Sequence, residues 1–113
     1  MLALDIRSGE LLDEIATRLD KRGIDNAALS IIGGVNGFEI INMSAADATQ
    51  RDTTTYDQPA EMIGTGELTD GHLHVHVSCG LEGGHARVGH LKAAWVDTWF
   101  VKVHVSPVDE VIS

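Results

Sequence analysis

Hydrophobic and polar residues alternate one by one in several segments of this chain, which is the pattern of β-strands with one buried face. The alternation is clearest at 72–77, where histidines take every second position and Leu73, Val75 and Val77 stand between them. Successive side chains of a strand point to opposite faces of its sheet. We therefore expect the histidines to line one face and the aliphatic side chains to pack on the other.

A different spacing predicts one helix. Between 9 and 22, apolar residues recur at every third or fourth position, and charged residues occupy the other side of the helix. Ser8 is the expected N-cap, and Gly23 is typical of the position just beyond the end of a helix. A helix with one apolar stripe is expected to cover a face of a sheet.

The other apolar segments predict further strands that are joined by short links. These segments are 1–7, 26–35, 38–43, 61–68 and 93–105. Asn36-Gly37 is typical of a two-residue turn. We therefore expect the segments on either side of this turn to pair as a hairpin.

Segment 44–58 is polar and weakly patterned. We expect a loop there, in which Thr53–Tyr56 pair with a neighbouring strand. Short links between strands favour antiparallel pairing. The predicted fold class is therefore α+β: a mainly antiparallel β-sheet with one principal N-terminal α-helix packed on it.

Length and composition are those of a single globular domain. The 113 residues are enough for one hydrophobic core, so we expect one domain over 1–113. The first residues lack the apolar segment of a signal peptide, and no apolar run is long enough to span a membrane. Cys79 is the single cysteine, which excludes an intramolecular disulfide and fits a reducing compartment. We expect a cytoplasmic protein.

The net charge argues against direct contact with nucleic acid. The chain carries 17 acidic and 8 basic residues, for a formal charge of −9, and the basic residues are scattered along it. Affinity for nucleic acid comes mainly from lysine and arginine side chains that displace counterions from phosphates. Unaided DNA binding is therefore disfavoured.

The histidines are the candidate chemistry of the sequence. His72, His74 and His76 would stand about 7 Å apart at each step along one face of the strand. Two neutral imidazoles at this spacing can bind one transition-metal ion if a third ligand comes from elsewhere, and His90 in the returning chain is the candidate. The alternative is a polar strand face that carries histidines without binding anything. The concentration of histidines in this part of the chain favours a site.

Three imidazoles leave one position open on a tetrahedral ion, as in catalytic zinc centres. An enzyme would also need a general acid or base beside the metal. The available carboxylates are Glu61, Glu67, Glu82 and Asp97, and no spacing in the sequence points any of them to the ion. Cys79 stands at the opposite strand parity from the histidines, so we expect a buried structural thiol rather than a ligand.

The order of several short motifs carries a resemblance to a known family. The motifs are Gly9-Glu10, Ser30–Val35, Glu61-Met62-Ile63, His72-Leu73-His74 and Gly89-His90-Leu91. In this order they resemble the plant and prokaryote conserved (PPC) domain. The resemblance covers about residues 2–105 and leaves 106–113 as a C-terminal tail.

The resemblance implies a homotrimer, and in some prokaryotic members a zinc-like ion held by the His-x-His pair and the later Gly-His. Matching the family's two histidine motifs to this sequence implies His72, His74 and His90 as the ligands. His76 has no firm counterpart and is left as an extra ligand, a supporting group or an exposed residue. The chain departs from the family at Gly71, where proline is common, and at Val88, where a second glycine is common.

Prokaryotic members of the family are often described as proposed DNA-binding proteins. Plant relatives carry a separate basic Pro-Arg-Gly-Arg-Pro segment for the minor groove, and this sequence contains no such segment. Three hypotheses follow: a trimeric module that binds a metal or small ligand, a transcription-associated protein that reaches DNA through partners, and a metal-dependent enzyme on a small substrate. We favour the first.

Overall fold

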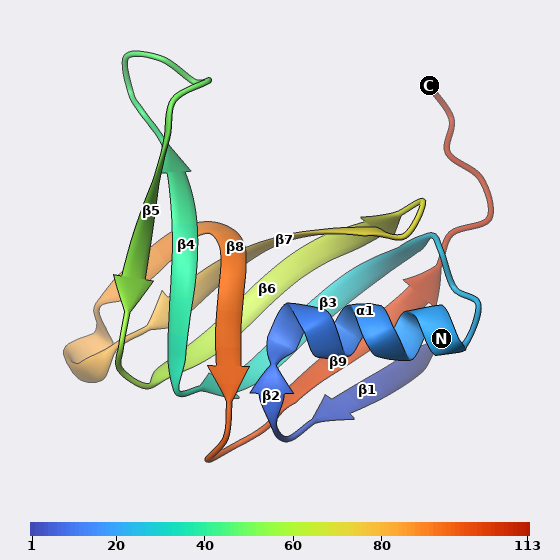
Figure 1. The fold of residues 1–113 in the computed structure, drawn as a ribbon, viewed down its shortest axis with the longest axis horizontal. Coiled ribbons are helices and arrows are strands. Elements are labelled where there is room, and N and C mark those ends of the chain that lie inside the picture. The colour runs from blue at the N-terminus through green and yellow to red at the C-terminus, as the bar shows by residue number, and fades with distance from the viewer.

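One antiparallel sheet dominates the computed structural model, which describes residues 1–113 (Figure 1). The strands are β1 (Leu2–Ile6), β2 (Gly9–Glu10), β3 (Ala27–Val35), β4 (Gly37–Met43), β5 (Arg51–Tyr56), β6 (Ala60–Thr69), β7 (His72–Gly80), β8 (Ala86–Val96) and β9 (Val101–Pro107). The helix α1 spans Leu11–Lys21, and a short 3-10 helix η1 spans Glu82–Gly84. The strand order is β1-β9-β3-β6-β7-β8-β4-β5, with β2 paired to β8. This confirms the predicted α+β class.

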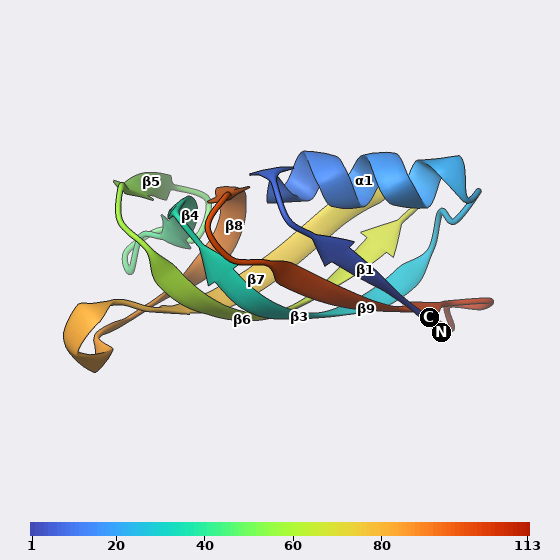
Figure 2. The ribbon, with the colours of Figure 1, turned by 90° about the horizontal axis from the view of Figure 1, so that it is seen from below.

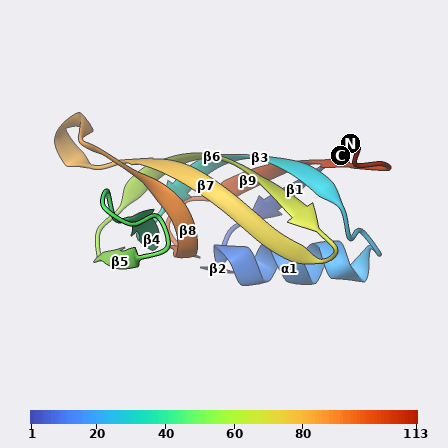
Figure 3. The same cartoon turned by 90° about the horizontal axis from the view of Figure 1, so that it is seen from above.

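The helix lies on one face of the sheet, and the opposite face is bare (Figures 2 and 3). The β8-β4-β5 end of the sheet bends toward the same side as α1. Leu11, Ile15 and Leu19 of the helix are buried in a core of 23 hydrophobic residues. Because alternate residues of the central strands β3, β6 and β7 point into this core, the intervening residues point to the bare face.

The helix begins two residues later than the sequence predicts. The carboxylate of Glu10 accepts hydrogen bonds from the backbone N–H groups of Leu12 at 3.1 Å and Asp13 at 2.9 Å. It also accepts one from the N–H of Ala94 in β8, at 2.9 Å. The predicted N-cap, Ser8, was therefore wrong: Glu10 caps the helix and ties its start to the sheet. The predicted end is confirmed, since Gly23 follows the helix at a φ of +69°.

The predicted hairpin between β3 and β4 was also wrong. Strand β3 pairs with β6 and β9, whereas β4 pairs with β5 and β8. The side-chain carbonyl of Asn36 accepts hydrogen bonds from the N–H groups of Asp97 and Thr98, and the backbone N–H of Asn36 donates to the carbonyl of Trp95. These three bonds hold Asn36 beside the end of β8, so the chain enters β4 next to β8.

The last predicted strand, 93–105, is two strands in the structure. Strand β8 ends at Val96, and β9 starts at Val101 after a turn. The turn packs directly on β3, where a Cβ added at Gly33 would lie 2.1 Å from the carbonyl oxygen of Phe100. Only a glycine allows this approach.

Two other predictions are confirmed. Strand β5 lies within the predicted loop 44–58, and Thr53–Tyr56 pair with β4 as expected. Cys79 is fully buried, and burial raises the pKa of its thiol to about 12. No helix in the structure has the length and apolar character needed to cross a membrane.

Candidate metal centre

Strand β7 sorts its residues between the two faces of the sheet as the alternation predicts. Val75 and Val77 are buried, whereas His72, His74 and His76 are exposed on the bare face. The aliphatic residues anchor the strand in the core. The imidazoles are therefore held on a rigid strand rather than on a loop.

The third imidazole comes from β8, which runs antiparallel to β7. His90 lies directly opposite His76 in the register of this pair. The ring centroids are 4.7 Å apart for His74 and His76, 5.2 Å for His74 and His90, and 5.6 Å for His76 and His90. One ligand atom from each of the three rings lies within 4.8 Å of the others.

The structure thus brings together two of the three residues that the sequence analysis selects. His72 is not in the cluster, and His76 takes its place. The reason is the register: β8 pairs with β7 from His76 to Gly80, whereas His72 lies at the start of β7, opposite Thr69 of β6. Of the predicted set, His74 and His90 therefore lie together with His76, and His72 lies outside this cluster.

Strand β6 adds a carboxylate to the site. Glu67 lies opposite His74 in the β6–β7 pair, and its Oε2 is 3.3 Å from Nδ1 of His74. The hydroxyl of Thr69 donates a hydrogen bond to the other oxygen, Oε1, at 3.0 Å. The Thr69 bond first, and the His74 bond second, lower the pKa of Glu67 below its ordinary value. The carboxylate is therefore charged where it meets the imidazole.

This contact could be found only in part from the sequence. The Asp70-Gly71 turn joins two alternating segments, and a two-residue turn places Thr69 opposite His72. Counting back two residues on one strand and forward two on the other places Glu67 opposite His74. None of Glu61, Glu82 and Asp97 forms part of the cluster or of the hollow of about 230 Å³ beside it, which Glu67 lines with His74 and His76.

The surroundings of His90 favour the neutral form of its imidazole. Burial first, and then the neighbouring His74, His76 and Arg51, lower the pKa of His90 below its ordinary value of 6.5. A metal binds the neutral imidazole, so a lowered pKa keeps this ring in its ligand form. Nε2 of His74 and Nε2 of His76 already lie 3.0 Å apart.

The nitrogen positions fit a transition-metal ion. Zinc–nitrogen bonds of about 2.0 Å in a tetrahedron place the nitrogens about 3.3 Å from one another. The spacing of His74 and His76, 3.0 Å between their Nε2 atoms, is close to this value, and no pair of ligand atoms in the cluster is more than 4.8 Å apart. All three ligands are nitrogens, which favours zinc, copper, iron or nickel over calcium and magnesium. A tetrahedral ion held by these three imidazoles would keep one further position for another ligand.

Comparison with known proteins decides the family. The family model described as the Plants and Prokaryotes Conserved (PCC) domain matches residues 2–108, nearly the whole chain. The chain belongs to the PCC domain family. This is the same family that the order of sequence motifs resembles, for which PPC is a second abbreviation. No curated protein matches the sequence.

Several solved structures share the fold of this protein over most of its chain. A plant- and prokaryote-conserved protein of Pyrococcus horikoshii is 23% identical with a TM-score of 0.78, over 96% of this chain and 79% of its own. A proposed DNA-binding protein of Bacteroides thetaiotaomicron is 20% identical with a TM-score of 0.80, over 98% and 80%. A metal-containing protein of Archaeoglobus fulgidus is 25% identical with a TM-score of 0.75, over 94% and 79%.

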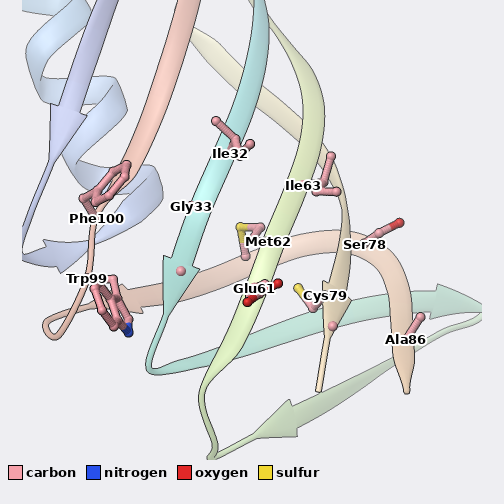
Figure 4. Close-up of a pocket in the computed structure, with 12 residues that line it drawn as sticks. Ile32, Gly33, Glu61, Met62, Ile63, Ser78, Cys79, Ala86, Trp99 and Phe100 are labelled. Atoms are coloured by element: carbon pink, nitrogen blue, oxygen red, sulfur yellow. The ribbon is translucent and has the colours of Figure 1, made fainter. Parts of the chain in front are cut away.

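The bare face of this PCC domain also carries an apolar hollow of about 670 Å³ (Figure 4). Trp99 and Phe100 from the β8–β9 turn line one side of it, and Ile32 and Ile63 come from the neighbouring strands β3 and β6. Ile32 lies opposite Ile63, and Ile63 opposite Ser78 of β7. Ser78, which lines the hollow, is two residues from His76 on the same face of β7, so the hollow lies next to the histidine cluster.

Proposed function

We propose that this PCC domain binds a divalent transition metal, zinc or a similar ion, through His74, His76 and His90. The observation that carries the proposal is the convergence of three imidazoles from two paired strands, with ligand atoms within 4.8 Å. The metal-containing relative of Archaeoglobus fulgidus supports the same reading.

The open fourth position defines what such a centre can do. It would hold a water molecule or a ligand atom of a small molecule, and the ion would supply Lewis-acid chemistry there, lowering the pKa of that water or polarising that ligand. The three protein ligands orient the ion, and the buried aliphatic residues of β7 keep them in place. The proposal is therefore a metal centre on this sheet face that would capture a small ligand.

The experiment is metal analysis of the purified protein, followed by zinc titration against a competing chelator. We expect one ion per chain in the wild type and loss of tight binding in His74→Ala and His90→Ala. His72→Ala is the matched control, because it removes an exposed imidazole from the same face of the same strand. A wild-type protein that binds no transition metal contradicts the proposal.

We also propose that the chain forms a homotrimer through its bare face. Ile32, Ile63 and Val88 are 56%, 66% and 57% exposed in the isolated chain. The register joins them into one row, from Ile32 through Ile63 and Ser78 to Val88. Exposed apolar side chains gathered along one row of a sheet face, here with Ser78 between Ile63 and Val88, are typical of an interface between subunits. Since the row borders the histidines, assembly would shield the metal centre from bulk water.

A further inference from the structure

Glu67 is the one charged side chain that touches the histidine cluster through a hydrogen bond. Its two oxygens have different partners: Oε1 accepts the hydroxyl proton of Thr69, and Oε2 lies 3.3 Å from Nδ1 of His74. Thr69 is two residues along the same strand, so its side chain lies on the same face. The carboxylate is thus fixed from both sides.

The contact determines which nitrogen of His74 carries the proton. A charged carboxylate only accepts hydrogen bonds, so Nδ1 of His74 must be the donor. In a neutral imidazole the lone pair is then on Nε2, which is the atom that lies 3.0 Å from Nε2 of His76. The nitrogen that faces the cluster is therefore the nitrogen that can bind a metal.

We propose that Glu67 is a positioning residue of the metal centre, which fixes the tautomer and the ring orientation of His74. The inference rests on the proposed metal-binding function and names a residue that does not itself bind the ion. Carboxylate–histidine–metal arrangements of this kind raise the basicity of the ligand. With the lone pair of His74 on Nε2, the 3.0 Å contact makes Nε2–H of His76 the donor in the metal-free protein. For Nε2 of His76 to bind an ion, its proton would have to move to Nδ1 of the same ring through solvent.

The geometry also sets the size of the effect. Partners behind a metal ligand typically contribute between 10-fold and 100-fold in affinity. The His74 and Glu67 side chains are 51% and 58% exposed, so water competes for the contact. We therefore expect the low end of this range, an increase of about 10-fold in the zinc dissociation constant of Glu67→Ala.

The test compares Glu67→Ala and Glu67→Gln with Glu61→Gln. Glu61 lies on the same strand and the same exposed face but faces Gly80, so its variant removes one negative charge without touching a histidine. In a chelator competition we expect weaker zinc binding in Glu67→Ala, a smaller loss in Glu67→Gln, which keeps an oxygen acceptor, and no change in Glu61→Gln. Equal affinity in all four proteins overturns the inference and leaves the metal centre intact.

Two spectroscopic measurements separate positioning from ligation. The ring ¹⁵N shifts of His74 in the metal-free protein should show the Nδ1–H tautomer in the wild type and a mixture of tautomers in Glu67→Ala. With cobalt bound, the visible bands should keep their positions in both Glu67 variants, because no ligand is lost. An unchanged tautomer overturns the inference, as does a cobalt spectrum that changes coordination. Failure of the wild type to bind any metal overturns the proposed function together with the inference.

Discussion

His90 lies directly across the β7–β8 pair from His76, with ring centroids 5.6 Å apart. This register places the third imidazole beside His76, in the middle of β7, rather than beside His72 at the start of the strand. Because neighbouring strands are hydrogen-bonded at fixed spacing, a shift of two residues would move His90 by about 7 Å. The composition of the candidate site therefore depends on one pairing.

The first prediction concerns His76 and His72, because the β7–β8 pairing places only His76 beside His90. His76→Ala removes one of the three imidazoles. We expect zinc affinity to fall by more than about 100-fold, which exceeds the loss typical of residues that only hydrogen-bond a metal ligand. His72→Ala should bind zinc as the wild type does. Chelator competition measures both. The reverse outcome, with His72 required and His76 dispensable, would restore the ligand set selected from the sequence.

The second prediction concerns pH. The folded protein holds the pKa of His90 below the ordinary value of 6.5, so the folded state binds fewer protons than the unfolded state in that window. The stabilising contribution is fully present above pH 6.5 and is lost as the pH falls through the window to the folded pKa. We expect urea midpoints of the metal-free protein to fall with acidification, and less so in His90→Asn. An equal pH slope in both proteins would contradict this assignment.

The same acidification should release the metal. The ligands must be neutral imidazoles, so protons compete with the ion for each ring nitrogen. We expect zinc affinity to fall steadily below about pH 6.5, the ordinary histidine value. A titration at several pH values measures this. Binding that stays constant down to about pH 5 would mean that histidines are not the ligands.

The third prediction concerns the start of α1. Glu10→Ala removes a cap that accepts three N–H hydrogen bonds, and loss of a cap costs about 1–2 kcal/mol of unfolding free energy. Ser8→Ala is the control, since Ser8 is the cap expected from sequence and makes no side-chain hydrogen bond in the structure. We expect a change within about 0.5 kcal/mol for this exposed residue. Chemical denaturation compares them, and equal effects would contradict the capping role of Glu10.

The fourth prediction concerns assembly. Ile63→Glu places a charge in the middle of the apolar row on the bare face, and we expect it to convert the trimer to monomers in light scattering coupled to gel filtration. Val111→Glu makes the same change at an exposed residue of the C-terminal tail. It should leave the trimer intact. A wild type that is monomeric at high concentration would contradict the proposed homotrimer.

Local patterns were sufficient for several elements. The alternation at 72–77 fixes which side chains share a face, because the two-residue period is a property of the strand itself. The end of α1 at Gly23 and the burial of Cys79 follow from equally local signals. The Asp70-Gly71 turn is enough to place Glu67 opposite His74 in the register, whereas the hydrogen bond between the two side chains is seen only in the structure.

Contacts between distant residues decided the rest. Asn36-Gly37 has the composition of a hairpin turn, yet hydrogen bonds from Asp97 and Thr98 to Asn36 send the chain to a different strand. Whether His76 or His72 lies beside His90 depends on how β8 aligns with β7. The spacing of the histidines in the sequence does not show where β8 begins to pair after the connection between the two strands. The sequence alone determined the fold class and the face that carries the imidazoles. Only the tertiary structure decided which of them meet, because strand register is set by the packing of the whole sheet.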